Sequence, residues 1–354
     1  MADAVADFAD RLRAAAASGS PLRLRGGGTK DFYGGELRGE LLDTRAHAGV
    51  VSYEPTELVV TARCGTPLAE LEAILARERQ QLAFEPPHFG DGATLGGCVA
   101  AGLSGPRRAA AGAVRDFVLG VRLLDGRGRD LSFGGRVMKN VAGYDVARLA
   151  AGSMGILGLI LEVSLKVLPQ AAAEATRRLE ATEAQAIEWA NRWAGQPLPV
   201  SATAWLDGVL HVRLSGAESA LRAGAAVVGG EAMRDADARA LWADVREHRH
   251  AFFAGDAPLW RLSVRSSAPP LGLPGAGLHE WNGALRWLRS SADVAEVRAA
   301  AAAAGGHATR FRGAGPRRDA FTPLAPATER LHRGLKAAFD PAAILNPGRL
   351  AAVL

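Results

Sequence analysis

Two glycine-rich segments near the start of the 354-residue chain have the residue types that bind a phosphate ligand. Residues 25–30 read RGGGTK, and residues 93–105 read ATLGGCVAAGLSG. A pyrophosphate needs several backbone N–H donors, and it cannot approach the main chain closely past β-carbons. In the second segment Leu95, Val99 and Leu103 recur at helical spacing, which a flexible linker does not require. The two segments therefore favour a phosphate ligand over purely structural turns.

The residues alone leave the identity of this ligand open. The strand-like sequence PLRLR leads into the first glycine run, but the glycine spacing is not G-x-G-x-x-G. No acidic residue ends a second strand at the distance that a Rossmann fold requires, and the sequence contains no G-x-x-x-x-G-K-[ST] motif. A Rossmann fold and a P-loop are therefore both disfavoured.

Short strands and helices surround the glycine segments. The strands expected in this half are PLRLR, ELVVTAR, DFVLGVRLLD and GLILEVSLKVL. The sequence TPLAELEAILARER predicts a helix in which Thr66 is the cap and Pro67 begins the first turn. After Pro169 the pattern changes to longer helices and isolated strands, so a domain boundary is expected near residue 170.

The second half predicts a sheet with helices on one face. The strands expected there are EATRRLE, SATAWLD, VLHVRLS, LWRLSV and HATRFRG, and they alternate with helices over about 183–194, 217–228, 237–253 and 293–304. This alternation is typical of a βαββαβ unit. The chain ends in a helix stopped at Asp340-Pro341 and a turn at Asn346-Pro347-Gly348.

Composition excludes several functional classes. The net charge is +5, but the arginine pairs are scattered and not interleaved with aromatic residues, which argues against a nucleic-acid partner. The most apolar run, GILGLILEVSLKVL, contains Glu162 and Lys166 and is shorter than the roughly 20 residues that span a bilayer. The N-terminus predicts an amphipathic helix rather than an export signal. A cytoplasmic protein without a transmembrane segment is expected.

Metal binding is also disfavoured. Cys64 and Cys98 form no C-x-x-C motif, and the eight histidines are scattered along the chain. Only His248 and His250 are close in sequence, and a spacing of two on a helix points their side chains apart. No metal site is expected.

The order of the glycine-rich segments resembles that of the vanillyl-alcohol-oxidase-type flavoproteins, which have a PCMH-type FAD-binding domain. The matching segments are LRLRGGGTKDFYG, ATLGGCVAAGLSGPRR, VRDFVLGVRLLDGRG, VMKNVAGYDVARLAAGSMGILGLILEVSLKVLP and LKAAFDPAAILNPGRL. Among these flavoproteins the chain is most similar to the family of E-type FAD-binding subunits of bacterial glycolate oxidase. The match covers nearly the whole chain.

The resemblance implies an α+β fold in three parts. Residues 1–170 would form a two-subdomain PCMH-type FAD-binding domain. Residues 171–323 would form a ferredoxin-like substrate or cap domain. Residues 324–354 would be a C-terminal helix and NPG turn that return to the FAD-binding domain.

The resemblance also implies a bound FAD. The two glycine segments would share its pyrophosphate, GSMGILGLI would lie near the ring or ribityl chain, and an ion pair of Lys139 and Asp145 would brace the KNVAGYD loop. Relatives with covalently held flavin have a histidine after the first glycine run, where this chain has Thr29, so noncovalent FAD is expected. The implied cofactor-binding residues are Gly26, Gly27, Gly28, Thr29, Lys30, Thr94, Gly96, Gly97, Cys98, Gly102, Ser104, Gly152, Ser153, Gly155, Gly158 and Ile160.

The catalytic residues cannot be named from the sequence. Related α-hydroxy-acid dehydrogenases have an H-x-G-D-G-N-x-H segment, and this chain has none. Oxidation of a 2-hydroxy acid needs a base for the hydroxyl proton and cations for the carboxylate. The candidates are Arg261 and Arg286 as carboxylate clamps and His307 as base, each with a structural role as the alternative. Three tryptophans nearby are typical of a core or of a contact surface for a partner: Trp260, Trp281 and Trp287.

The function implied is that of an FAD-binding subunit of a glycolate oxidase complex, which oxidises glycolate to glyoxylate and passes electrons through flavin to an iron–sulfur partner. The partners implied are the D-type catalytic flavoprotein and the F-type iron–sulfur protein of glycolate oxidase, with peripheral association at the inner face of the cell membrane through the complex. Two alternatives stay open. One is a self-sufficient FAD-dependent dehydrogenase of a small 2-hydroxy acid, and the other is a non-catalytic assembly protein that keeps the flavin fold.

Overall fold

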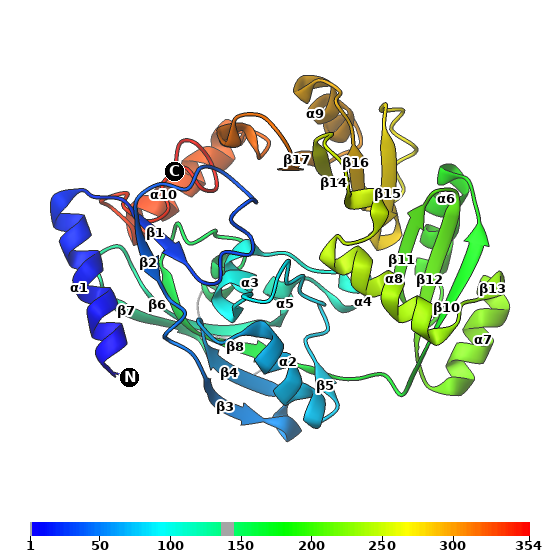
Figure 1. Cartoon of the computed structure of the whole chain (residues 1–354), viewed down its shortest axis with the longest axis horizontal. Helices are drawn as coiled ribbons and strands as arrows, with labels where there is room; N and C mark the ends of the chain where they lie inside the picture. The colour runs from blue at the N-terminus through cyan, green and yellow to red at the C-terminus, as the bar shows by residue number, and fades with distance from the viewer. Residues whose placement is uncertain (1, 136–144) are drawn as a thin grey trace. The chain divides into compact units, whose positions relative to one another are not determined.

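The structure is a computed structural model that describes residues 2–135 and 145–354 (Figure 1). The chain divides into two compact units. Unit 1 contains Met1–Leu103, Ala113–Pro169 and Pro316–Leu354, and unit 2 contains Ser104–Gly112 and Gln170–Gly315. The short piece 104–112, which directly follows the second glycine segment, thus belongs to unit 2, and no sequence signal indicated this.

Unit 1 is built on a five-stranded antiparallel sheet with the order β3-β4-β8-β6-β7. Its strands are β3 (Val50–Glu54), β4 (Val59–Arg63), β6 (Val118–Leu124), β7 (Asp130–Gly134) and β8 (Leu159–Lys166). The central strand β8 is an almost continuous apolar run, and six of its eight residues are buried. A strand covered on both faces requires this pattern in place of an alternating one.

Two smaller strand pairs complete the sheets of unit 1. β1 (Leu22–Arg25) pairs in parallel with β2 (Glu40–Asp43), and β5 (Gln80–Gln81) pairs with β9 (Leu168–Pro169). Leu345 forms a parallel bridge with Leu22, so the C-terminal segment extends the β1–β2 pair. Figure 1 shows this segment, in red, beside β1.

Helices of unit 1 pack against these strands. They are α1 (Ala2–Ser18), α2 (Leu68–Arg77), α3 (Leu95–Ala101), α5 (Val114–Phe117), α10 (Pro326–Phe339) and the 3-10 turns η1 (Pro55–Glu57), η2 (Ala147–Ala150) and η5 (Arg317–Asp319). One buried cluster joins Phe8 and Leu12 of α1 to Leu42 of β2, Leu159 of β8 and Leu345. The C-terminal segment is therefore part of the core of unit 1.

Two local predictions in unit 1 are wrong. Thr66 does not cap α2: Pro67 is the cap, and the buried Thr66 hydroxyl instead bonds both backbone groups of Gly49, at 3.0 and 3.3 Å. Residues 116 and 117, expected as strand, belong to the helical turn α5. Asp116 Oδ2 accepts a hydrogen bond from the Ala113 amide at 2.9 Å, and this bond fixes the turn.

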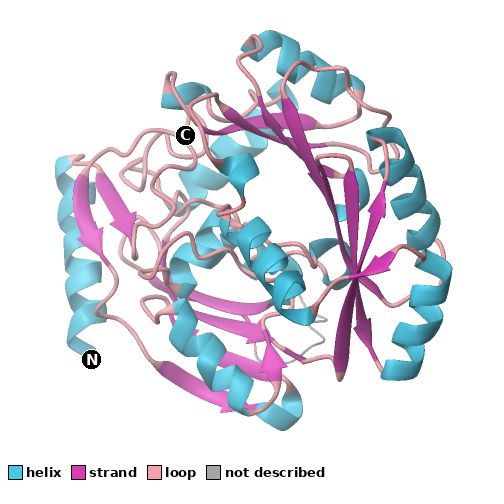
Figure 2. Ribbon diagram, turned by 45° about the vertical axis from the view of Figure 1, so that its right-hand side comes forward, coloured by secondary structure: helices cyan, strands magenta, loops and turns pink. Residues whose placement is uncertain are grey.

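Unit 2 contains one eight-stranded antiparallel sheet with the order β13-β10-β12-β11-β15-β16-β14-β17 (Figure 2). Its strands are β10 (Ala173–Glu180), β11 (Val200–Leu206), β12 (Val209–Gly216), β13 (Glu231–Ala232), β14 (Leu259–Ser263), β15 (Ala276–Glu280), β16 (Leu285–Arg289) and β17 (His307–Arg312). Its helices are α4 (Arg108–Ala111), α6 (Glu183–Ala194), α7 (Glu218–Val228), α8 (Asp235–Glu247), α9 (Val294–Ala303) and the turns η3 (Ala251–Phe253) and η4 (Trp281–Gly283).

The strand order reveals two ferredoxin-like halves where the sequence predicted one βαββαβ unit. β13-β10-β12-β11 and β17-β14-β16-β15 both follow the order 4-1-3-2, and β11 pairs with β15 to join them. In the second half a loop over 264–275 replaces the first crossover helix. The buried Arg286 holds this loop by donating to the carbonyls of Ala268 and Pro269.

The helices of unit 2 divide between the two faces of the sheet. α6 and α7 share one buried cluster with β10 and β12, and α9 packs on Trp260 and Leu262 of β14. On the other face, Trp242 of α8 donates a hydrogen bond to Thr176 at 2.9 Å. α8 is shorter than the predicted helix over 237–253, because His248 adopts a left-handed conformation (φ +54°) that ends it.

Candidate functional site

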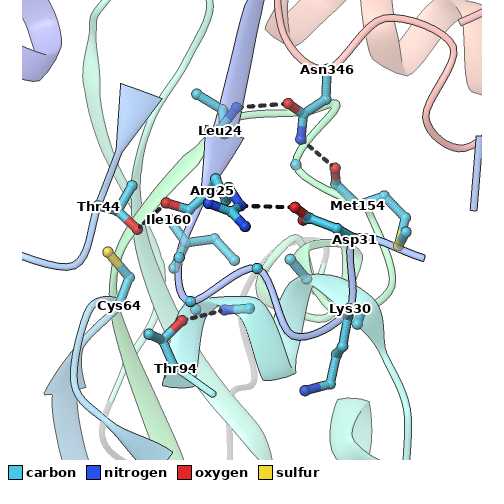
Figure 3. Close-up of a pocket in the computed structure, with 18 of the residues that line it drawn as sticks. Leu24, Arg25, Lys30, Asp31, Thr44, Cys64, Thr94, Met154, Ile160 and Asn346 are labelled. Carbon is cyan, nitrogen blue, oxygen red and sulfur yellow. Dashed lines mark hydrogen bonds and ion pairs between the residues drawn. The ribbon is translucent and has the colours of Figure 1, made fainter. Parts of the chain in front are cut away.

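Unit 1 contains a cavity, open to solvent on one side, that residues of both glycine segments line (Figure 3). Its walls come from four parts of the chain: the first glycine segment, the start of α3, the loop before β8 together with β8, and the C-terminal segment. These parts are distant in sequence and meet only in the folded chain. The remaining walls are the ends of β1, β2 and β4, together with Leu37.

The two glycine segments touch through their backbones beside this cavity. A β-carbon on Gly27 would lie 1.5 Å from the carbonyl oxygen of Gly92, and one on Gly26 would lie 2.2 Å from Thr94 Oγ1. Any side chain would force the two loops apart. Within the part of the chain that the structure describes, the amides of Gly27 and Gly28 donate no hydrogen bond, so they are available to an anionic ligand.

The α3 segment is held tightly by its neighbours. Thr94 Oγ1 accepts a hydrogen bond from the Gly97 amide at 3.3 Å and caps the helix, and the Gly96 amide donates to Cys64 O at 2.8 Å. A β-carbon on Gly96 would lie 2.7 Å from Cys64 Cβ, so glycine permits this close packing. The helix expected from Leu95, Val99 and Leu103 thus forms over Leu95–Ala101.

Charged side chains stand at the rim of the cavity. Arg25 Nε contacts Asp31 Oδ2 at 2.8 Å, and both side chains are about one-third exposed. Lys30 Nζ donates to the His88 carbonyl at 3.1 Å. Figure 3 shows Arg25 turned toward Asp31 above the first glycine segment and Lys30 directed away from it. The guanidinium of Arg25 is therefore the cation placed nearest to the glycine loop, where a phosphate would lie.

The C-terminal segment fixes the cavity walls through Asn346. Its Oδ1 accepts from the Leu24 amide and its Nδ2 donates to Met154 O, both at 2.7 Å. Leu24 lies in β1, and Met154 lies in the loop before β8. One side chain, 8% exposed, therefore connects two walls of the cavity (Figure 3).

Arg349 performs a similar role on the first glycine segment. Its guanidinium donates to the Lys30 carbonyl at 3.2 Å and to the Gly35 carbonyl. Burial lowers the pKa of Arg349 to about 10, so it stays protonated at neutral pH. The buried pair Lys336–Asp340 anchors the C-terminal segment that contains Arg349. Lys336 Nζ also donates to the carbonyls of Ile156 and Leu345, at 2.9 and 2.7 Å.

Most of the expected cofactor-binding residues line this cavity. They are Gly26, Gly27, Gly28, Thr29, Lys30, Thr94, Gly96, Gly97, Gly155, Gly158 and Ile160. Twelve further residues line it that were not named individually from the sequence, although Met154 and Leu159 belong to the expected segment GSMGILGLI: Leu24, Arg25, Asp31, Leu37, Thr44, Cys64, Ala100, Ala101, Met154, Leu159, Asn346 and Arg349. The missed residues belong mainly to strand ends and to the C-terminal segment, which have no glycine signature.

Five expected residues do not line the cavity. Cys98 is buried on α3, and Ser153 donates to the Ala150 carbonyl at 2.9 Å. The backbones of Gly102 and Gly152 pack against each other, since a β-carbon on Gly102 would lie 2.7 Å from Gly152 Cα. Ser104 belongs to unit 2.

The predicted ion pair between Lys139 and Asp145 in the KNVAGYD loop stays a prediction, because the structure describes only one of the two residues. Lys139 lies outside the described residues. Asp145 forms its ion pair with Arg148, at 2.7 Å.

The three catalytic candidates lie on opposite faces of the sheet of unit 2. Arg286 is buried, and its guanidinium is occupied by the carbonyls of Ala268, Pro269 and Gly283. It is structural. Arg261 of β14 and His307 of β17 lie in adjacent rows of the other face, because Arg261 pairs with Thr309 and Ser263 pairs with His307.

The tryptophans of this region are core residues. Trp260, Trp281 and Trp287 are at most 4% exposed. The interpretation that they contact a partner protein is therefore wrong. Among the described residues, no group of three histidine, cysteine or acidic side chains is arranged to hold a metal ion, and no helix is long and apolar enough to cross a membrane.

Two sequence families match the chain. The family described as "FAD binding domain" matches residues 1–134, and the family described as "FAD linked oxidases, C-terminal domain" matches residues 284–350. The first contains both glycine segments, and the second contains the C-terminal segment that completes the cavity. These matches define an FAD-linked oxidoreductase, with FAD as its cofactor.

Similarity to individual proteins shows which family the chain belongs to. The chain is 46% identical over 345 residues to glycolate oxidase subunit GlcE of Escherichia coli (strain K12), which covers 98% of this chain and 97% of that protein. It therefore belongs to the FAD-binding oxidoreductase family that includes this subunit, as the resemblance of the glycine-rich segments predicted. A D-lactate dehydrogenase of Archaeoglobus fulgidus is 33% identical over 156 residues, which cover 42% of this chain and 34% of that protein.

The fold is also found among solved structures. A structure of alkyldihydroxyacetonephosphate synthase aligns with a TM-score of 0.67 at 16% identity, over 96% of this chain and 74% of that one. This likeness supports the α+β fold.

The cavity of unit 1 suits the FAD that this family binds. Gly27 and Gly28 line it with amides that donate no hydrogen bond among the described residues, and Arg25 adds a cation to the same lining. When bound, FAD supplies the capacity to accept two electrons from a substrate.

Proposed function

We propose that the chain is the FAD-binding subunit of a glycolate oxidase complex and takes part in the oxidation of glycolate to glyoxylate. The observation that carries the proposal is the similarity over nearly the full length of both chains to the E. coli subunit, and the cavity lined by the glycine segments supports it. The relatives named GlcE and GlcD are described as subunits, which supports a multi-subunit enzyme.

The proposed partners are the D-type catalytic flavoprotein and the F-type iron–sulfur protein of glycolate oxidase. The two cysteines, Cys64 and Cys98, are both buried, and burial raises the pKa of each thiol to about 12. Two thiols cannot supply the four thiolates of an iron–sulfur cluster. The iron–sulfur centre that receives the electrons in this proposal therefore belongs to another protein. Within the cell we place the chain in the cytoplasm, with attachment to the membrane surface only through the complex.

The proposed binding set for FAD is the cavity lining of both glycine segments with Asn346 and Arg349. The amides of Gly27 and Gly28 bind the diphosphate together with Arg25. The loop over 152–158 and Ile160 contact the ring or the ribityl chain. No histidine stands at Thr29, and the FAD is held without a covalent bond.

Dye reduction by glycolate tests the proposed function. The FAD-loaded chain alone should give no turnover, and addition of the partner proteins should restore it. A self-sufficient hydroxy-acid dehydrogenase would instead turn over without partners. If the partner proteins oxidise glycolate equally well without this chain, the proposed role as a subunit is excluded.

A further inference from the structure

We propose that one face of the sheet of unit 2 binds a small carboxylate through Arg261, with Trp281 and Arg108 as the supporting groups. The inference rests on the proposed function for the identity of the ligand, a 2-hydroxy acid or its 2-oxo product. The three residues come from β14, from the turn η4 between β15 and β16, and from α4. All three belong to unit 2.

Arg261 is the cation at the centre of this site. Its neighbours in β14, Trp260 and Leu262, point to the opposite face and pack on α9. The half-buried Arg261 lies with its guanidinium carbon 5.3 Å from the Trp281 ring centroid. Among the residues that the structure describes, no carboxylate is within ion-pair distance of this guanidinium. A guanidinium has a planar set of donors that matches a carboxylate, so this group is suited to bind one.

A second cation lies against the same indole. The guanidinium carbon of Arg108 is 4.4 Å from the Trp281 ring centroid. An anion bound at Arg261 beside this indole would therefore be attracted by a second positive charge as well. The buried indole lowers the local dielectric and therefore strengthens both interactions.

The turn that holds Trp281 is strained. Trp281 and Asn282 both have positive φ, +54° and +57°, a conformation that is rare for a bulky residue. Such strain persists only where the surrounding structure enforces it, and it is concentrated at ligand sites. The strained turn thus fixes the indole that both guanidinium groups contact.

Four hydrogen bonds enforce this conformation. Trp281 Nε1 donates to Gly105 O at 3.0 Å, and the Asn282 amide donates to Thr203 Oγ1 at 2.9 Å. The Thr203 hydroxyl donates to Asn282 Oδ1, and Asn191 donates to Asn282 O, both at 3.0 Å. The position of the indole is therefore set before any ligand binds.

The two histidines near the site, His248 and His307, add no positive charge to that of the arginines at neutral pH. Burial and the charge of Arg261 both lower the pKa of His307, and burial, Arg312 and Arg261 lower the pKa of His248. Both imidazoles are consequently neutral at pH 7. His307 lies one row from Arg261 and is exposed, so it can exchange a hydrogen bond with the hydroxyl of a bound hydroxy acid.

Calorimetric titration of the FAD-loaded chain tests the proposal. The probes are glycolate, oxalate as a carboxylate that cannot be oxidised in the same way, and methyl glycolate, which lacks the charge. Glycolate and oxalate should bind, and methyl glycolate should not. Arg261→Gln should weaken oxalate binding at least tenfold, and Arg261→Lys should recover part of it. FAD content and unfolding temperature of each variant show that it is folded.

Arg239→Gln is the matched control, because Arg239 is an exposed arginine of α8 in the same unit. It should bind oxalate as the wild-type chain does. Equal binding by wild type and Arg261→Gln, or binding of methyl glycolate as tight as glycolate, overturns the carboxylate site and leaves the proposed function intact. Oxalate binding that depends on Arg261, in a chain whose complex does not oxidise glycolate, supports the site and overturns the proposed function.

Discussion

The variant Asn346→Gly measures how much the C-terminal segment contributes to FAD binding. Asn346 has φ +40°, a conformation that glycine adopts without strain, so the change removes the side chain and leaves the backbone free to keep its path. The lost groups are the acceptor for Leu24 N and the donor for Met154 O. Both bonds hold walls of the FAD cavity together.

The magnitude follows from these two bonds. A hydrogen bond contributes about 1 kcal/mol net, and a buried group left unpaired costs about 1–3 kcal/mol. Removing both bonds should therefore cost the folded chain about 2 kcal/mol, since Met154 is buried and Leu24 is half-buried. Both bonds also form without FAD, so the dissociation constant for FAD should rise by at most the roughly 30-fold that this cost corresponds to at about 1.4 kcal/mol per factor of ten.

Titration of the apo-chain with FAD, followed by quenching of flavin fluorescence, gives this constant. Asn282→Gly is the matched control: it is also an asparagine with positive φ, but it lies in unit 2 and bonds Thr203. It should lower the unfolding temperature and leave FAD affinity unchanged. An Asn346→Gly chain with wild-type FAD affinity would refute the role of the C-terminal segment.

Further predictions concern the cofactor, the thiols and metals. Gly97→Asp should abolish FAD retention, because its β-carbon would press on Thr94 Oγ1 at 3.2 Å and its carboxylate would add a negative charge to the lining where the diphosphate is proposed to bind. Acid precipitation should release all the flavin, and colour left in the pellet would show a covalent bond. Burial raises the pKa of Cys64 and Cys98 to about 12, whereas unfolded thiols ionise near pH 8.5, so the unfolded chain binds fewer protons above about pH 8.5. The free energy of unfolding should fall as pH rises from there to about 12, by up to about 1.4 kcal/mol per unit for each thiol, and a Cys64→Ala chain unfolded in denaturant at pH 8 and 10 should show a smaller fall. Elemental analysis after chelator treatment should find no stoichiometric metal, and retained zinc, iron or manganese would contradict this.

The glycine segments could be predicted from the sequence because close backbone contact leaves a direct signature. Gly27 and Gly96 are glycines for local steric reasons, which a single sequence displays. Asn346 and Arg349 gave no such signal. Their partners Leu24 and Lys30 are more than 300 residues away in sequence, and only the fold brings them together.

Unit 2 shows a second limit of prediction from the sequence. The predicted strands formed, but β15 and β16 were not predicted, and with them the second ferredoxin-like half was missed. The position of these strands also determines whether Arg261 or Arg286 is available to bind a ligand. Arg286 of β16 faces the loop that replaces a helix and is fully paired there, whereas Arg261 of β14 faces the other side. Residue types alone do not distinguish the two.

The most direct test of the account is an anaerobic absorption spectrum of the purified chain, recorded before and after glycolate and again after addition of the partner proteins. The account predicts about one flavin per chain, a spectrum unchanged by glycolate alone, and bleaching once the partners are present. A colourless chain that does not take up FAD would contradict the cofactor site. Bleaching of the isolated chain by glycolate would identify a self-sufficient dehydrogenase and contradict the dependence on a complex.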